Sequence, residues 1–263
     1  MAGVGAQYTP GVSETEYRSK AWSKEIEEYC FRNILARRLN LSNWNFSRGG
    51  ASNDYNFDQA SAIFGDAEKK KKFLDSNPVV LWGITSTARL LRGKENIQLK
   101  PNRDISMLLF LEEPYINAPS NEDLKFILQD QQTLYSTLYL KLFYDHENEV
   151  QRIGNQIEVW NDIFEYHGVP VIWFDTFNHH MYPNQIRNFF QGGDLLTQML
   201  DYKNLRYVSD KKWYHLSDWT NDDGRIDVGV KNHLLNPFTY HPGQDGHKIL
   251  AEILTPSIQP LIK

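Results

Sequence analysis

The sequence predicts a three-layer α/β fold with a mostly parallel sheet. Two short apolar runs, residues 78–84 and 169–174, are bounded by turn residues and are typical of strands buried on both faces. Stretches with the helical spacing of apolar residues alternate with these runs. Strands that alternate with helices along a chain favour a sheet covered by helices on both faces. At 263 residues, the chain suits one domain with insertions.

The first third of the chain predicts strands and helices in alternation. Residues 1–5 predict a very short first strand. A core-facing helix is predicted to end near Leu39, because apolar side chains recur before it at four-residue steps: Trp22, Ile26, Cys30 and Ile34. Residues 43–47 alternate and predict a strand, residues 48–53 predict a tight turn, and residues 57–74 predict a helix.

Two weakly periodic stretches, residues 91–120 and 175–238, are predicted to be insertions in this single domain of residues 1–263. The first is polar and irregular, and the second is rich in aromatic residues, Asn, Asp and Gly. Long irregular stretches are usually functional surfaces or insertions. Between them, residues 121–166 predict one very long helix, or two helices broken around residues 145–148.

Composition excludes several classes of protein. The net charge of −5 argues against a general nucleic-acid binder. The single cysteine, Cys30, excludes an intrachain disulfide and a Cys-based zinc site. No cofactor and no metal are expected: His179 and His180, near Asp175, are adjacent, and adjacent residues of a strand point to opposite faces. No apolar run approaches the roughly 20 residues that span a bilayer. The first residues lack a signal-peptide pattern, so we expect a soluble protein.

The end of the chain carries a motif typical of a catalytic loop. Pro242 holds the preceding His241 out of helical space, so this histidine is expected on an extended loop. A helix is predicted after Gly246, because the apolar residues that follow share one helical face: Ile249, Leu250 and Ile253. The alternative is a capped C-terminal helix that begins with His-Pro and has no catalytic role.

Four sequence blocks resemble the SGNH (GDSL-type) esterase and lipase family. In that family the histidine before the proline is the general base, which implies this role for His241. Residues 45–53 resemble the second block, where Gly50 stands at the glycine whose N–H binds the oxyanion. Residues 79–86 resemble the third block. The resemblance implies a flavodoxin-like three-layer α/β/α sandwich.

Three positions depart from the family pattern. Residues 5–11 align with the first block, and its nucleophilic serine falls on Gln7, whose amide has no comparable nucleophilic oxygen. Thr85 replaces the third-block asparagine, so Thr85 or Ser86 is the remaining candidate oxyanion donor. The aspartate that orients the histidine is also missing, because these positions hold Thr239 and Phe238. More distant carboxylates remain open as its replacement: Asp222, Asp223 and Asp227.

The altered blocks predict a protein without catalytic activity that acts as a binding or structural module. The resemblance implies a component of a virus particle or another assembly, in the cytoplasm or on a virion. Expected partners are protein subunits or a glycan, and the expected binding residues are Asn53, Ser86 and Thr9. A plain turn, with Asn53 or Ser52 as N-cap, is the alternative for the second block.

The alternative function is an active carbohydrate or lipid ester hydrolase of the O-acetyl esterase type. Its general base would be His241, and its oxyanion donors would be Gly50 and Thr85. A hydroxyl elsewhere would replace the lost serine, and the candidates are Thr9, Ser13 and Ser52. The aromatic stretch 175–238 would stack on sugar rings, contact a protein partner, or belong to the core.

Overall fold

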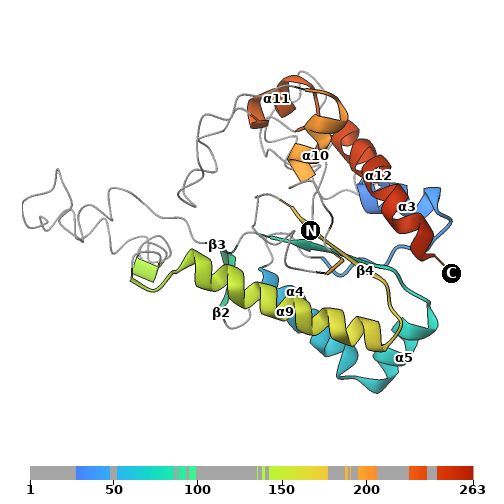
Figure 1. The fold of residues 1–263 in the computed structure, drawn as a ribbon, viewed down its shortest axis with the longest axis vertical. Helices are drawn as coiled ribbons and strands as arrows, with labels where there is room; N and C mark the ends of the chain where they lie inside the picture. Colours follow the sequence, from blue (N-terminus) through green and yellow to red (C-terminus); the bar gives the residue numbers. More distant parts are fainter. Residues whose placement is uncertain are drawn as a thin grey trace, which may run out of the picture.

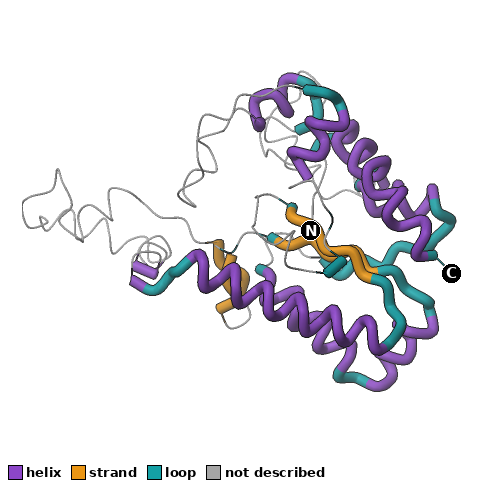
Figure 2. The backbone as a smooth tube through the Cα atoms, in the orientation of Figure 1, coloured by secondary structure: helices purple, strands orange, loops and turns teal. Residues whose placement is uncertain are grey.

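A computed structural model of the chain shows a mixed α/β fold with a short parallel sheet between two groups of helices (Figure 1). The tube in Figure 2 shows the paired strands near the centre, with helices on both sides. The structure describes residues 28–47, 52–85, 87, 89–92, 95–98, 135, 138–139, 142–176, 187–188, 190, 195–205, 225–235 and 242–262.

The parallel sheet consists of β1 (Val80–Ile84) and β4 (Val171–Asp175). Their register pairs Val80 with Val171 and Ile84 with Asp175. Both strands coincide with the two apolar runs, so these two strand predictions are confirmed. The runs are apolar at nearly every position because helices cover both faces of the sheet.

Alternate side chains of the sheet enter two separate cores. Trp82 and Trp173 pack into the first core, whereas Ile172 and Phe174 pack into the second. This period of two is the normal alternation of a strand. It allows two short strands to hold both helix layers.

The first helix layer contains three helices: α4 (Asn53–Phe64), α5 (Ala67–Asp75) and α9 (His146–Tyr166). The single helix expected over residues 57–74 is wrong, because the chain breaks between α4 and α5. The Asp66 carboxylate accepts the backbone N–H groups of Glu68 (3.0 Å) and Lys69 (3.1 Å) and so starts a new helix. The break expected around residues 145–148 is confirmed, since Asp145 caps α9.

The second helix layer contains α3 (Phe31–Arg38), α10 (Leu195–Tyr202), α11 (Arg225–Lys231) and α12 (Gln244–Ile258), followed by η2 (Gln259–Leu261). The predicted C-terminal helix is therefore confirmed. It packs against α3 and α10 around a core that includes Leu250 and Leu254, both 0% exposed.

Other predictions require correction. Residues 41–47 have no regular secondary structure, so the strand expected over residues 43–47 is wrong. The stretch expected to be irregular from residue 91 begins inside a hairpin of β2 (Arg89–Arg92) and β3 (Glu95–Gln98). The second weakly periodic stretch contains α10 and α11. The strand expected over residues 1–5 lies outside the described residues.

No helix in the described ranges is both long and apolar enough to cross a membrane.

Candidate functional site

Buried polar residues gather where β1 and β4 end and where α4 begins. Parallel strands place their carboxyl ends at one edge of a sheet, and ligands of open α/β sheets bind beyond that edge. Within the described ranges, six polar side chains around this edge are at most 6% exposed: Ser52, Asn53, Thr85, Thr87, Asp175 and Thr176. We call this set the carboxyl-edge cluster.

Asn53 joins the start of α4 to the end of β1. Its Nδ2 donates to the carbonyl oxygen of Thr85 at 2.9 Å, and the backbone N–H of Thr85 donates to its Oδ1 at 2.9 Å. Asn53 is 2% exposed, so both bonds are shielded from water. Two predicted site residues, Asn53 and Thr85, thus lie together. An amide suits this position because it can donate one hydrogen bond and accept another from the same partner.

Thr176 ties the end of β4 to the end of β1. Both its Oγ1 (2.8 Å) and its backbone N–H (3.1 Å) donate to the carbonyl oxygen of Ile84. The strands approach closely here, since a Cβ on Gly83 would lie 2.6 Å from Cγ2 of Thr176. Sequence reasoning missed Thr176. Its place directly after a buried strand was the available signal.

Tyr144 and Thr87 form a second polar contact near this edge. Their hydroxyl oxygens lie 2.6 Å apart. Burial raises the pKa of Tyr144 to about 12, and the hydrogen bond from Thr87 offsets part of this increase. The neutral phenol is therefore the form that this position favours.

We expect Tyr144 to ionise at about pH 12 in the folded chain, above the ordinary tyrosine pKa of 10.0. Because folding raises the pKa of Tyr144, the neutral phenol contributes to stability. This contribution is present below pH 10 and is lost as the pH rises through about 12. Spectrophotometric pH titrations are recorded for the original chain and for Tyr144→Phe, and their difference isolates the signal of the Tyr144 phenolate. Thr87→Val should move it to higher pH. A difference signal centred near pH 10 would contradict the assignment.

The C-terminal block is tightly packed against the second helix layer. Leu235 and Pro242 form a β-bridge, and the N–H of Gly243 donates to Leu234 O at 2.8 Å. A Cβ on Gly246 would lie 2.3 Å from the same carbonyl oxygen, so this close approach requires glycine. Pro242 and Gly243, directly before α12, are thus held by backbone contacts.

The second histidine of the block, His247, is 0% exposed. Its Nδ1 accepts the backbone N–H of Phe31 at 3.3 Å, and its ring stacks on the Phe31 ring at 6.1 Å. His247 therefore connects α12 to α3.

The remaining predicted site residues lie outside the described residues: Gln7, Thr9, Gly50, Ser86 and His241. The same holds for His179 and His180. Within the described part of the chain, no group of three or more His, Cys, Asp or Glu side chains is arranged to hold a metal ion.

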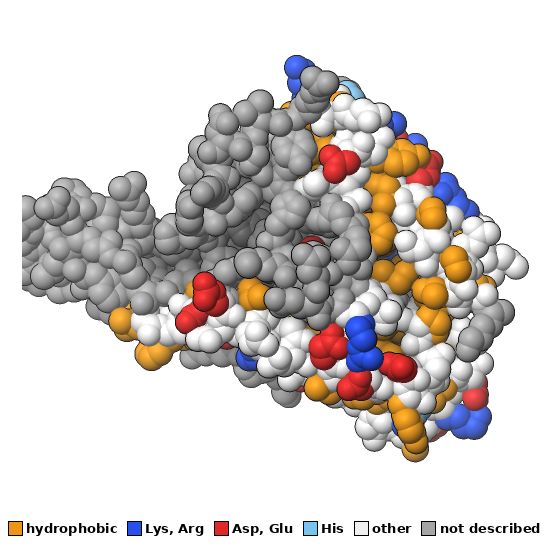
Figure 3. All heavy atoms as spheres, in the orientation of Figure 1, with side chains coloured by type: hydrophobic (Ala, Val, Ile, Leu, Met, Phe, Trp, Pro, Cys, Tyr) orange, Lys and Arg blue, Asp and Glu red, His pale blue; other side chains and the backbone are white. Residues whose placement is uncertain are grey.

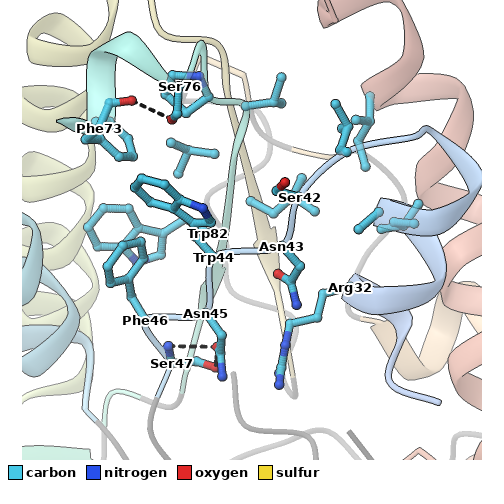
Figure 4. A pocket seen from close by; sticks show the side chains of 18 of the residues that line it. Arg32, Ser42, Asn43, Trp44, Asn45, Phe46, Ser47, Phe73, Ser76 and Trp82 are labelled. Atoms are coloured by element: carbon cyan, nitrogen blue, oxygen red, sulfur yellow. Dashed lines mark hydrogen bonds between the residues drawn. The ribbon is translucent and has the colours of Figure 1, made fainter. Parts of the chain in front are cut away.

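A cavity of about 630 Å³ lies beside the edge of β1 that faces away from β4 (Figure 4). The segment 41–47 borders it, and its lining mixes aromatic side chains such as Trp44 and Phe46 with neutral polar ones such as Asn43 and Asn45. The indole N–H of Trp82 is buried and has no hydrogen-bond partner within the described ranges. Sequence reasoning did not predict this cavity.

The described part of the surface in Figure 3 carries acidic, basic and hydrophobic side chains near one another. Arg187 illustrates the mixture, since its guanidinium contacts three carboxylates: Glu158, Asp162 and Glu165. A broad basic surface of the kind that binds nucleic acid is not seen among the described residues of this face.

Comparison of the chain with protein-family models, curated proteins and solved structures found no match.

Proposed function

We propose that this protein has an SGNH-hydrolase-like fold, a flavodoxin-like α/β/α sandwich, and acts as a non-catalytic binding or structural module. The observation that supports the proposal most is the pair of hydrogen bonds between Asn53 and Thr85. These residues belong to the second and third blocks of the resemblance. Their contact brings these two blocks together at one edge of the sheet, as the proposal expects, although the nucleophile position holds Gln7.

The carboxyl-edge cluster supports a binding role. Its polar side chains stand where open α/β sheets bind ligands. A glycan or a protein subunit of an assembly, such as a virus particle, would be held there through hydrogen bonds instead of covalent chemistry. Asn53 would act by shaping this edge, because both polar atoms of its amide already bond to Thr85.

The alternative, an ester hydrolase with a relocated nucleophile, depends on a hydroxyl near His241. Of the three candidate hydroxyls, Ser52 lies in the described part of the chain. It is 0% exposed, and its Oγ accepts the N–H of Tyr55 at 3.2 Å as the N-cap of α4. This arrangement suits a helix cap better than a nucleophile.

Turnover of p-nitrophenyl acetate by the full chain tests the proposal. The variants are His241→Ala and Gln7→Ser, and His233→Ala, an exposed histidine, is the matched control. We expect the original chain to release p-nitrophenol no faster than the His241→Ala variant. Turnover that His241→Ala abolishes and His233→Ala leaves intact would overturn the proposal in favour of the hydrolase. Turnover gained in Gln7→Ser alone would support a retained site that lacks its nucleophile.

A further inference from the structure

The cavity beside β1 has a buried hydrogen-bond donor in its wall. Trp82 is 8% exposed, and its indole N–H has no hydrogen-bond partner in the described part of the chain. Neighbouring rings fix the direction of this N–H, since the ring centroids of Phe57 and Trp173 lie 5.3 Å and 4.8 Å from that of Trp82. In Figure 4 the nitrogen-bearing edge of Trp82 is turned toward the side where Asn43 lies. A buried donor is costly without an acceptor, so an occupant of the cavity has to supply one.

The backbone of β1 adds polar groups to the same cavity. The carbonyl oxygen of Ile84 accepts the N–H of Thr176, so Ile84 turns its backbone toward β4. Backbone groups alternate in direction along a strand, so those of Gly83 and Leu81 turn away from β4. Both residues line the cavity. A flat molecule laid along this edge would therefore meet backbone donors and acceptors.

Aromatic rings cover another part of the wall. Trp44 and Phe46, in the segment 41–47, line the cavity and are 43% and 48% exposed. The amino group of Lys72 lies 5.7 Å from the centre of the Trp44 ring and helps to hold it in place. In Figure 4 the rings of Trp44, Phe46 and Trp82 gather on one side. Flat aromatic ligands stack favourably against such rings.

The lining of the cavity suits an uncharged occupant. Among the described residues that line it, Arg32 is the one that carries a charge, and none is acidic. A lining without a carboxylate disfavours a cation. Arg32 comes from α3 and lies on the opposite side of the view from the Trp82 ring in Figure 4. Near the rings the polar groups are neutral, so a charge placed there would lose its hydration without a partner.

We propose that the cavity binds an uncharged, flat aromatic heterocycle that carries a hydrogen-bond acceptor, such as a ring nitrogen. The heterocycle stacks against the aromatic wall, and its acceptor receives the N–H of Trp82. The volume of about 630 Å³ lies within the range of small-molecule sites, roughly 300–1,000 Å³. None of the six residues of the carboxyl-edge cluster lines the cavity, so the inference goes beyond the proposed function and does not depend on it.

Binding of four small probes at pH 7 tests the inference, with the full chain titrated into each probe and binding followed by the NMR signals of the probe. Quinoline has a ring nitrogen, naphthalene has the same shape without it, N-methylquinolinium is a cation and 2-naphthoate is an anion. We expect quinoline to bind with a dissociation constant below about 1 mM and at least about tenfold more tightly than naphthalene, which leaves the Trp82 N–H unpaired. Both charged probes should bind more weakly than quinoline.

Two variants locate the bound probe. Trp82→Phe keeps an aromatic ring but removes the N–H, so the preference for quinoline over naphthalene should disappear. Trp44→Ala removes an aromatic wall at a position that is 43% exposed, so it should weaken the binding of both probes. Tyr166→Ala is the matched control, because Tyr166 is 85% exposed on α9, and it should bind both probes as the original chain does.

A preference for quinoline that Trp82→Phe removes and Tyr166→Ala retains supports the inference. Equal affinity of the original chain for quinoline and naphthalene would overturn it, as would the lack of quinoline binding at about 1 mM. Tighter binding of 2-naphthoate than of quinoline would overturn it too, since Arg32 would then recognise an anion. If Trp82→Phe does not fold by circular dichroism, Trp44→Ala decides: quinoline binding that this variant leaves unchanged would place the probe outside the cavity and contradict the inference.

Discussion

Replacing Asn53 by alanine is expected to lower the free energy of unfolding by about 2–5 kcal/mol. The change removes both bonds to Thr85 and leaves its N–H and carbonyl oxygen without their amide partner. Thr85 is 6% exposed and Asn53 is 2% exposed, so water is poorly placed to replace either bond. Each buried polar group that loses its partner costs roughly 1–3 kcal/mol. Urea denaturation followed by tryptophan fluorescence measures the loss.

Two further variants separate this pair from general damage to α4. Asn53→Asp keeps the acceptor for the Thr85 N–H but sets a carboxylate oxygen against the Thr85 carbonyl oxygen, so it should destabilise at least as much as alanine. Asp58→Ala changes an exposed residue of the same helix and should stay within about 0.5 kcal/mol of the original chain. If Asn53→Ala behaves like Asp58→Ala, the pair contributes little and does not hold the carboxyl edge together.

The sequence was most informative where one residue pattern determines the outcome. The runs that became β1 and β4 are apolar at almost every position because both faces are covered, and this pattern does not depend on a particular partner. Asn53 and Thr85 are separated by 32 residues, so their contact follows from the tertiary fold. The sequence pointed to both residues only through the family resemblance.

The wrong predictions have local physical reasons. Residues 43–47 alternate as a strand does, but a strand also requires a partner for its backbone groups. Asn45 instead uses its Oδ1 to accept the N–H of Ser47 at 3.0 Å. The hairpin of β2 and β3 was missed because its strands are polar, although Gly93 and Lys94 between them are a recognisable two-residue turn signal. The break at Gly65 and Asp66 was also visible as a cap signal.

The largest loss of stability is expected for Trp173→Ala, at about 4–6 kcal/mol. Trp173 is 0% exposed at the centre of β4, and its ring lies 4.8 Å from the Trp82 ring. Removing the indole leaves a cavity in the first core, which costs roughly 3–5 kcal/mol for a large aromatic side chain. It also removes the 2.8 Å hydrogen bond from Nε1 to Oδ1 of Asn161, which is 2% exposed. Chemical denaturation measures the sum.

Two milder variants divide this loss into packing and hydrogen bonding. Asn161→Ala keeps the ring and leaves its N–H unpaired, so it should cost about 1–3 kcal/mol. Trp173→Phe keeps an aromatic ring but loses both the bond and part of the volume, so its cost should fall between those of Asn161→Ala and Trp173→Ala. Tyr166→Ala, at an 85% exposed position, should change little. If Asn161→Ala alone cost as much as Trp173→Ala, the bond would dominate and the ring would contribute little by packing. The contact with Trp82 argues that packing contributes more than the hydrogen bond, because this contact joins β1 and β4, the two strands that lead into Thr85 and Thr176.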